Sequence, residues 1–337
     1  MKTLRWGLLS TARINRRLIP AIRRARRAEL VAAASRTQES AGAYAAEWKI
    51  PRALSSYQAL LDDPAIDAVY ISLPNSLHAD WTVRAAQAGK HVLCEKPLAQ
   101  SVADCDRIQA AAEAAGVVVA EAIMYLYHPL LAEARRLARD GALGKVTFAR
   151  GSFSFILDSP ENVRWRPDLG GGALWDVGIY PVSFCRWMLG EPDRVFAWQT
   201  LAGTVGFANR VDEATAGVLH FPGGETAAFD CSFRQAFRTQ VEVAGSEATL
   251  IIDRPFLLRP DSRMVLRDNQ DHEEPIGDPR PDPYQCEVEA IAATVFDGAP
   301  LPVPLSSSRS SVAALVALYE SARLGAPVTL EPPTQSR

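Results

Sequence analysis

The stretch WGLLSTARIN, residues 6–15, joins an apolar run to a segment with helical periodicity. The run at residues 4–9 is short and rich in large apolar side chains, which is typical of a buried strand. Similar runs alternate with helix-like segments as far as residue 121. This alternation predicts a parallel sheet with helices on both faces, the doubly wound α/β fold. The expected strands are residues 4–9, 30–34, 68–73, 91–94 and 117–120, and the expected helices are 12–27, 38–48, 57–61, 79–88 and 102–115.

The second part of the chain has a different pattern. Strand-like runs follow one another here with turn signals such as Pro222-Gly223-Gly224 between them, which predicts an α+β domain with a large, mostly antiparallel open sheet. Residues 268–283 are rich in Pro and Asp and are expected to form a long surface loop. We therefore predict domains at 1–124 and 125–337. The expected strands are 146–155, 194–200, 214–221, 226–233, 240–243 and 248–252, and the expected helices are 128–140, 285–296 and 308–323.

Composition excludes several classes of function. The net charge of -3 gives no general attraction to nucleic acid, and the arginines between residues 13 and 27 lack the interleaved aromatics of a nucleic-acid surface. The longest apolar runs are too short for a membrane span or a signal peptide. The five cysteines show no metal-ligand spacing, so we expect reduced thiols, no metal and a cytoplasmic location.

The turn after the first strand is a candidate dinucleotide loop. Its fingerprint positions are Ser10, Ala12 and Asn15, which are small or modest in size although none is glycine. The hydroxyls of Ser10 and Thr11 can donate to phosphate oxygens, and a helix N-terminus attracts a diphosphate. An ordinary strand-to-helix turn is the alternative.

The end of the second strand bears on the choice of cofactor. An NAD site normally has an acidic residue there, but this chain has Ser35-Arg36. A hydroxyl and a guanidinium suit a 2′-phosphate, which favours NADP(H) over NAD(H). A turn arginine that faces water is the alternative.

Two further stretches carry candidate catalytic groups. Glu95-Lys96-Pro97 follows the fourth strand, at the edge where doubly wound sheets bind ligands, so Lys96 can hold a substrate oxygen. In GGGALWDVGIYP, residues 170–181, a flexible glycine run precedes an expected helix on which Asp176 and Tyr180 share one face. A surface lysine, a helix-turn acid and core aromatics are the alternatives.

Together these motifs resemble the glucose-fructose oxidoreductase / inositol dehydrogenase (Gfo/Idh/MocA) family over nearly the whole chain. The resemblance is carried by LPNSLH (73–78), GKHVLCEKPL (89–98) and GGGALWDVGIYP, and it is nearest the dihydrodiol dehydrogenase, NADP-dependent D-xylose dehydrogenase and anhydrofructose reductase branches. The glycine-poor loop departs from the commonest family pattern. Tyr180 stands where inositol dehydrogenase-like members have histidine, and a phenol with a pKa of about 10 needs a neighbouring cation to lose its proton.

The resemblance implies roles for particular residues. Lys96, Asp176 and Tyr180 would be catalytic, with Tyr180 as acid/base and Lys96 beside the reacting oxygen. The implied substrate contacts are Lys96, Tyr125, Phe155, Asp176 and Tyr180. The implied cofactor contacts are Ser10, Thr11, Ala12, Arg13, Ile14, Ser35, Arg36, Leu73, Pro74, Asn75, Leu77, His78, Glu95, Lys96, Trp165, Arg166 and Tyr284.

The resulting expectation is an NADP(H)-dependent oxidoreductase that transfers a hydride to or from a CH–OH/C=O carbon of a sugar, ketosugar or related cyclic polyol. An NAD-retaining glycoside hydrolase or lyase and a non-catalytic NADP sensor remain alternatives. Residues 215–221 and 226–233 carry apolar side chains on both alternating sets, which predicts a homodimer or homotetramer through the second sheet. No nucleic-acid or membrane partner is expected.

Overall fold

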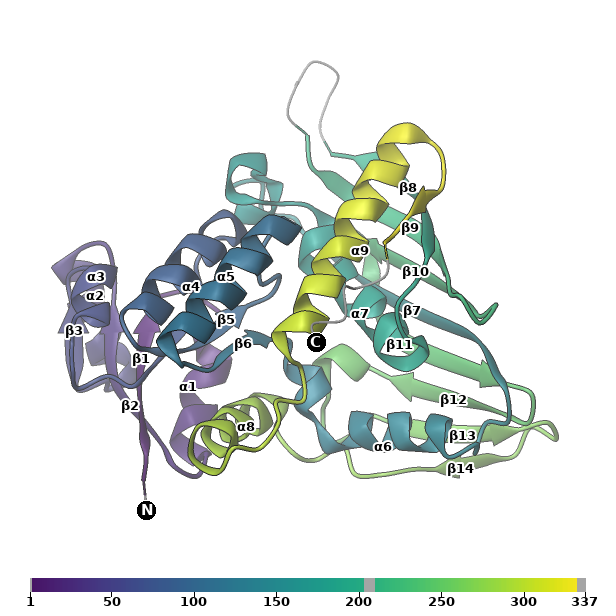
Figure 1. Cartoon of the computed structure of the whole chain (residues 1–337), viewed down its shortest axis with the longest axis horizontal. Helices are drawn as coiled ribbons and strands as arrows, with labels where there is room; N and C mark the ends of the chain where they lie inside the picture. Colours follow the sequence, from purple (N-terminus) through teal and green to yellow (C-terminus); the bar gives the residue numbers. More distant parts are fainter. Residues whose placement is uncertain (1, 203–209, 332–337) are drawn as a thin grey trace. The chain divides into compact units, whose positions relative to one another are not determined.

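The computed structural model describes residues 2–202 and 210–331, which form two compact units (Figure 1). Unit 1 comprises Met1–His128 and Asp282–Arg309, and unit 2 comprises Pro129–Pro281 and Ser310–Arg337. The boundary predicted at residue 124 therefore misses that residues 282–309 return to the first unit. Helix α8 (Pro283–Asp297) packs there against α1 (Asn15–Arg24), and Val288 and Ile291 join the buried cluster of the first sheet. Residues 332–337 of the predicted second domain lie outside the described residues.

Unit 1 contains a six-stranded sheet in the order β3-β2-β1-β4-β5-β6, and every pairing in it is parallel. This confirms the predicted doubly wound fold. The three residues of β3 were not predicted, because so short and half-buried a strand leaves no clear periodicity. The strands are β1 (Leu4–Leu9), β2 (Ala28–Ala34), β3 (Arg52–Leu54), β4 (Ala68–Ile71), β5 (His91–Glu95) and β6 (Val119–Ala122).

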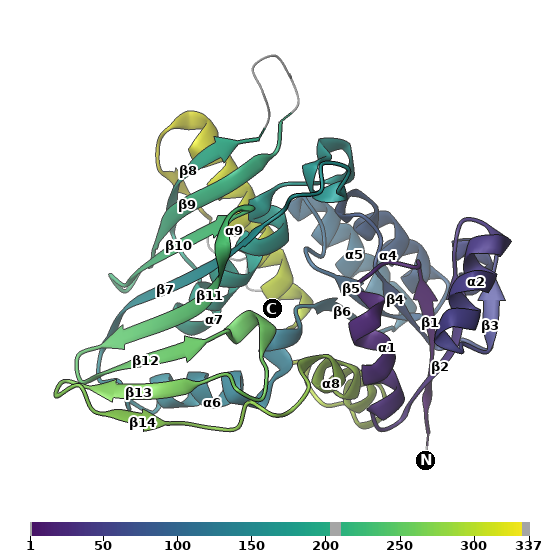
Figure 2. The same ribbon diagram turned by 180° about the vertical axis from the view of Figure 1, so that it is seen from behind.

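The two faces of β1 bury different helices. Leu4, Trp6 and Leu8 join a cluster with residues of α1 and α8, whereas Gly7 lies against Leu60 of α3 on the other face. Helices α4 and α5 pack side by side (Figures 1 and 2). The remaining helices of unit 1 are α2 (Gln38–Trp48), α3 (Tyr57–Leu61), α4 (His78–Gln87) and α5 (Val102–Ala115), with short turns η1 (Asn75–Leu77) and η2 (Met124–Tyr127).

Unit 2 contains a nine-stranded sheet in the order β14-β13-β12-β11-β7-β10-β9-β8-β15. All of its pairings are antiparallel except that of β10 with β7, which confirms the predicted class. The loop predicted at 268–283 is partly wrong, because β13 ends and β14 lies inside it; these strands are too short and polar to be recognised. The strands are β7 (Val146–Ile156), β8 (Arg194–Leu201), β9 (Asp212–His220), β10 (Thr226–Ser232), β11 (Arg234–Gly245), β12 (Ala248–Asp253), β13 (Met264–Asp268), β14 (Glu273–Pro275) and β15 (Val328–Thr329).

The helices of unit 2 gather on one side of this sheet (Figure 2). Close packing of α7 on β7 requires Gly151, since a Cβ there would lie 2.7 Å from Pro181 Cβ. Within the described residues, no helix has both the length and the apolar character needed to span a membrane. The helices are α6 (Pro129–Arg139), α7 (Ile179–Leu189) and α9 (Leu305–Leu324), of which α9 belongs to unit 2 only from residue 310 onward. The π-helical turn η5 (Leu174–Gly178) precedes α7, and the short turns are η3 (Val163–Trp165), η4 (Pro167–Leu169) and η6 (Pro255–Leu257).

Candidate active site

In unit 1, the segments predicted to bind the cofactor follow the carboxyl ends of neighbouring parallel strands. Ser10 follows β1, Ser35 follows β2, Ser72 follows β4 and Lys96 follows β5. Because parallel strands end at the same edge of a sheet, one edge carries all four segments. The order of the strands reverses between β1 and β4, which is where this class of sheet forms its ligand crevice.

The turn after β1 is built around Ser10, whose φ of +136° lies in a region that favours glycine. Ser10 is buried, and its Oγ lies 3.0 Å from the carbonyl oxygen of Ser72 and 2.8 Å from its hydroxyl. Asn15 donates its side-chain amide to the Ser10 carbonyl at 2.9 Å, and the Ser72 hydroxyl donates to Asn15 Oδ1 at 2.8 Å. The Ser10 hydroxyl is therefore used inside the protein, which differs from the expected donation to phosphate.

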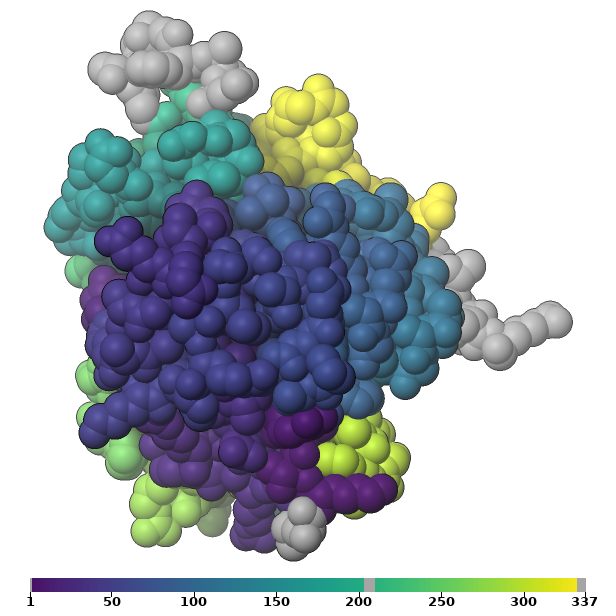
Figure 3. Space-filling view, turned by 90° about the vertical axis from the view of Figure 1, so that its left-hand side faces the viewer, coloured from purple at the N-terminus to yellow at the C-terminus, as the bar shows by residue number. Residues whose placement is uncertain are grey.

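The start of α1 retains the features that a diphosphate needs. Among the described residues, the N-cap Ile14 has no side-chain capping bond, and the first turn contains no acidic residue. Arg13, Arg16 and Arg17 are exposed there. Figure 3 shows a face of unit 1, in purple and blue. An uncapped helix N-terminus with surrounding arginines fits an anionic cofactor without glycine in the fingerprint positions.

At the end of β2, one of the two predicted residues is available for a phosphate group. Ser35 is buried, and its hydroxyl donates to Ser40 Oγ at 3.0 Å, so this group too is used within the fold. Arg36 is exposed and interacts electrostatically with Tyr57. Thr37 caps α2 by accepting from the Ser40 amide. Arg36 is thus the group at this strand end that can meet a 2′-phosphate.

His78 ties two predicted cofactor loops together. Its Nδ1 lies 2.7 Å from the carbonyl oxygen of Pro97, and its Nε2 lies 2.8 Å from that of Leu73. Burial lowers the pKa of His78, and Lys96 acts in the same direction, whereas both backbone contacts raise it. The two ring nitrogens therefore contact the two loops, one each. Lys96 lies in one of these loops, where a cis peptide bond joins it to Pro97.

Beyond Lys96, a group of acids and tyrosines connects β4, β5 and α8. Tyr70 donates a hydrogen bond to Glu95, and burial raises the pKa of Tyr284, with Glu95 and Glu287 adding to the shift. Glu287 is buried, and neither of its carboxylate oxygens has a hydrogen-bond partner among residues 2–202 and 210–331. Burial, and then Glu95, hold the pKa of Glu287 well above its usual range. Sequence reasoning missed Glu287, although it stands one helical turn after Tyr284.

In unit 2, Asp176 pairs with an arginine that the sequence did not single out. Arg164 donates from Nε to Asp176 Oδ2 at 2.5 Å, and the carboxylate is largely buried. Arg166, predicted to contact the cofactor, makes a bidentate pair with Asp168 at 2.9 and 2.7 Å, and both side chains are exposed. The only available signal was the pair of arginines flanking Trp165, which does not reveal which of them turns toward Asp176.

Tyr180 lies in an aromatic cluster of unit 2. Its ring centroid is 5.3 Å from that of Phe153 and 5.4 Å from that of Phe256, and only 7% of the residue is exposed. The predicted Phe155 and Trp165 both pack on Phe233, each at 5.3 Å between ring centroids. Unit 2 thus gathers four predicted residues in or next to one cluster of aromatic rings. These residues are Asp176, Tyr180, Phe155 and Trp165. Tyr125 belongs to η2 in unit 1 and is fully buried.

The glycine run before Asp176 is closely packed, which corrects the expectation of a flexible backbone. A Cβ at Gly171 would lie 2.4 Å from the carbonyl oxygen of Arg164. Gly170 and Gly172 have positive φ values of +77° and +123°. The helix that follows starts as a π-turn and continues as α7 from Ile179. Glycine is needed here because the chain passes close to the segment that supplies Arg164.

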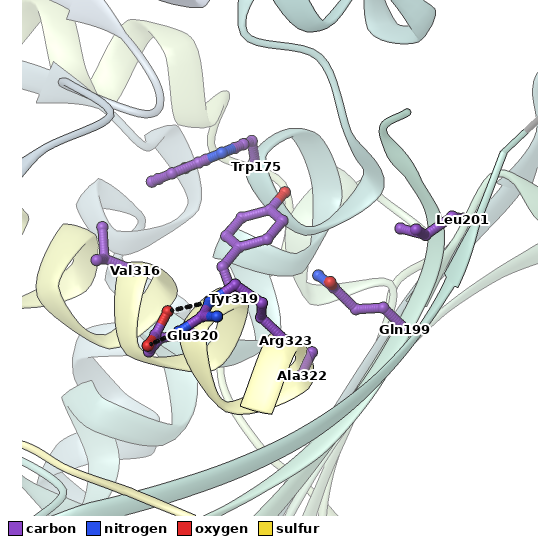
Figure 4. Close-up of a pocket in the computed structure, with 8 residues that line it drawn as sticks. All are labelled: Trp175, Gln199, Leu201, Val316, Tyr319, Glu320, Ala322 and Arg323. Carbon is purple, nitrogen blue, oxygen red and sulfur yellow. Dashed lines mark hydrogen bonds and ion pairs between the residues drawn. The ribbon is translucent and has the colours of Figure 1, made fainter. Parts of the chain in front are cut away.

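A hollow of about 680 Å³ lies between α9 and β8 in unit 2 (Figure 4). Tyr319 and Trp175 stand beside one another on its wall, with ring centroids 5.3 Å apart. Because Asp176 and Tyr180 are not among its lining residues, we do not assign it to the candidate active site. The lining residues are Trp175, Gln199, Leu201, Val316, Tyr319, Glu320, Ala322 and Arg323.

Comparison with known families agrees with both units. Residues 4–123 match the "Oxidoreductase family, NAD-binding Rossmann fold", and residues 131–251 match the "GFO/IDH/MocA C-terminal domain". The chain belongs to the GFO/IDH/MocA family. It is therefore an NAD(P)-dependent oxidoreductase, and the resemblance found in the sequence is confirmed.

Individual relatives cover almost the whole chain. A D-xylose 1-dehydrogenase (NADP(+)) from Haloferax volcanii is 41% identical, over 97% of this chain and 99% of its own. Among solved structures, an aldose-aldose oxidoreductase from Caulobacter crescentus complexed with glycerol has a TM-score of 0.90 and 29% identity, covering 98% of this chain and 100% of its own. The 3-ketoreductase KijD10 from Actinomadura kijaniata, complexed with NADP and TDP-benzene, has a TM-score of 0.86 and 28% identity, over 95% and 98%.

Proposed function

We propose that this protein is an NADP(H)-dependent oxidoreductase that interconverts a CH–OH group and a carbonyl group on a sugar, a ketosugar or a related cyclic polyol. The observation that carries the proposal is the pairing of Asp176 with Arg164, one helical turn before Tyr180 in its buried aromatic cluster. Sugar dehydrogenases and ketoreductases among the relatives support this substrate class.

The choice of NADP(H) rests on the carboxyl edge of unit 1. Arg36 is exposed at the end of β2, and no carboxylate stands at Ser35-Arg36 to repel a 2′-phosphate. The uncapped start of α1 would hold the diphosphate. The xylose dehydrogenase relative uses NADP(+), and KijD10 was solved with NADP, which supports the same cofactor here.

The proposed chemistry divides hydride and proton transfer. The bound nicotinamide supplies or accepts the hydride. In reduction, the phenol of Tyr180 donates its proton to the carbonyl oxygen, and in oxidation the phenolate takes the hydroxyl proton. The Lys96 ammonium would stabilise negative charge on that oxygen and on the phenolate. Asp176, held by Arg164, would accept a hydrogen bond from a neighbouring hydroxyl of the substrate and so orient it.

Solved structures of one relative include variants at a tyrosine and at a lysine. KijD10 has been solved in a form with one tyrosine replaced by phenylalanine, and in forms with one lysine replaced by alanine or by glutamate. By the resemblance of its motifs, we give the corresponding roles in this chain to Tyr180 and Lys96.

The test replaces the proposed acid. Tyr180→Phe should lower turnover by at least about 100-fold, the usual contribution of a positioned acid or base, and leave the Kd for NADPH within about two-fold. Tyr44→Phe, the same change in unit 1, is the control. Purified protein is assayed over aldoses, ketosugars and dihydrodiols, with NADPH oxidation and NADP reduction followed separately. Normal turnover in Tyr180→Phe would remove the role of Tyr180.

The same assay separates the two alternative functions. Cleavage of a glycosidic bond without net oxidation, by protein that keeps its cofactor through gel filtration, would indicate the NAD-retaining hydrolase or lyase. Tight NADPH binding with no turnover on any compound would indicate a sensor. For the cofactor itself, Arg36→Ala should weaken NADPH about 10-fold and NADH little, with Arg26→Ala as the exposed-arginine control.

We further propose that a second copy of the chain covers the open face of the unit 2 sheet. Trp198 on β8 and Val218 on β9 are 68% and 50% exposed and lie diagonally across neighbouring strands, while Leu219 on the opposite face is buried. Large apolar side chains exposed next to one another on a sheet face favour an interaction surface. Trp198→Glu should lower the mass measured by light scattering, whereas Leu324→Glu, at an exposed apolar residue of α9, should not.

A further inference from the structure

A buried carboxylate reaches the first turn of the helical segment that carries Asp176 and Tyr180. Asp212, the first residue of β9, is only 1% exposed. Its Oδ2 accepts the backbone N–H of Leu174 at 2.7 Å, although the two residues are 38 positions apart in the chain. The local N-cap, Ala173, has no side-chain capping bond within the described chain. Asp212 therefore performs the capping that no local side chain performs, with negative charge at the positive end of the segment.

Two further donors fix the Asp212 carboxylate. The Thr215 hydroxyl donates to Oδ2 at 2.8 Å, and the Tyr319 hydroxyl donates to Oδ1 at 2.7 Å. Burial raises the pKa of Asp212, while these three hydrogen bonds act in the opposite direction. A buried carboxylate with three donors has little freedom to rotate, so the Leu174 amide that it holds is fixed as well.

The glycine run is shaped around this contact. A Cβ at Gly172 would lie 2.4 Å from Asp212 Oδ1 and 2.8 Å from the Tyr319 hydroxyl oxygen. The close approach of Asp212 to the start of the segment therefore needs glycine at position 172. Three distant parts of unit 2, namely the glycine run, the start of β9 and α9, meet at one carboxylate that belongs to none of the predicted catalytic groups.

We propose that Asp212 is a positioning residue: it sets the placement of Asp176 and Tyr180 by capping their segment through the Leu174 N–H, while Tyr319 and Thr215 hold the carboxylate in orientation. Asp176 is two residues beyond the capped amide, and Tyr180 is six residues beyond it. A displacement of about 1 Å at a reacting group costs on the order of 100-fold in rate, so loss of the cap should be seen in turnover. The inference rests on the proposed function of Tyr180.

The test compares changes that remove one hydrogen bond at a time. Thr215→Val removes the hydroxyl while keeping the shape, Thr215→Ser restores it, and Tyr319→Phe removes the second donor. Asp212→Asn keeps the size of the side chain but places an NH₂ group among donors. We expect kcat to fall about 10- to 100-fold in Asp212→Asn and less in Thr215→Val and Tyr319→Phe. In each variant the Kd for NADPH should stay within about two-fold, and Thr215→Ser should recover the wild-type kcat.

A second readout does not depend on activity. Exchange of the Leu174 amide hydrogen should quicken relative to that of amides in the middle of α7 in every variant that lacks a bond to Asp212. Unchanged kcat in Thr215→Val and Tyr319→Phe, together with unchanged Leu174 exchange, would overturn the proposal, even if Asp212→Asn fails to fold. If the wild type turns over no compound, the proposed function fails on its own, and Leu174 exchange still decides whether Asp212 caps the segment.

Discussion

Replacing Ser10 tests how a dinucleotide loop can be built without its usual glycine. The native φ of +136° costs a serine on the order of 1–3 kcal/mol, because the Cβ meets the backbone. Against this, the buried Ser10 Oγ contacts Ser72 and accepts the Ala12 N–H at 3.2 Å. At about 1 kcal/mol for each hydrogen bond, two such bonds stabilise the turn by about 2 kcal/mol.

The two simplest substitutions separate these contributions. Ser10→Ala keeps the strained φ and loses the bonds, so the free energy of unfolding should fall by about 2 kcal/mol. Ser10→Gly loses the same bonds but releases the backbone strain. The gain from releasing the strain is reduced by about 0.5–1 kcal/mol, because glycine has more freedom in the unfolded chain. The glycine variant should therefore be more stable than the alanine variant by about 1 kcal/mol.

Urea unfolding followed by the fluorescence of the buried tryptophans gives both values, provided that the slope m is unchanged. An alanine variant as stable as the glycine variant would refute the reasoning from backbone strain. Ser72→Ala serves as the second arm of a double-mutant cycle, in which the effects at Ser10 and Ser72 should not add. NADPH affinity should change less than about three-fold in Ser10→Gly, and a 10-fold loss would show that the hydroxyl serves the cofactor after all.

Three further predictions follow from buried groups. Gly172→Ala should lower the free energy of unfolding by about 2–4 kcal/mol, because its Cβ would meet Asp212. Gly190 has a φ of +98° and open space around it, so Gly190→Ala should lose only the backbone cost of about 1–2 kcal/mol. Equal losses in the two variants would contradict the packing argument. The raised folded-state pKa of Glu287 means that the folded protein keeps a proton that the unfolded chain releases above a pH of about 4.3. The contribution of Glu287 to stability should therefore fall as pH rises, by at most about 1.4 kcal/mol per unit. Glu287→Gln should remove that slope in urea titrations between pH 5 and 8, and parallel slopes would count against it. His78→Phe should lose about 1–3 kcal/mol, because it removes the ring N–H that donates to one of two buried backbone carbonyls, and an unchanged urea midpoint would contradict this.

Much of the fold follows from local patterns in the chain. The run at residues 4–9 and its counterparts specify a parallel sheet, because apolar segments of strand length alternate with helix-length amphipathic segments. The short strands β3, β14 and β15 carry too few residues to show a period, and their pairing with longer neighbours decides them. Local periodicity likewise cannot show that α8 returns to the first unit, because that depends on which hydrophobic face is left to cover.

For the site, the sequence by itself determined which chemical groups stand at the strand ends and on the segment around Asp176 and Tyr180, since motif spacing and helical periodicity are local properties. Only the tertiary structure decided how those groups are used. It pairs Asp176 with Arg164, which the sequence did not single out, and it turns the Ser10 hydroxyl inward to Ser72, 62 residues away. These choices depend on contacts between segments that are distant in the chain. Such a contact stabilises the protein only after folding has brought both partners together and removed them from water.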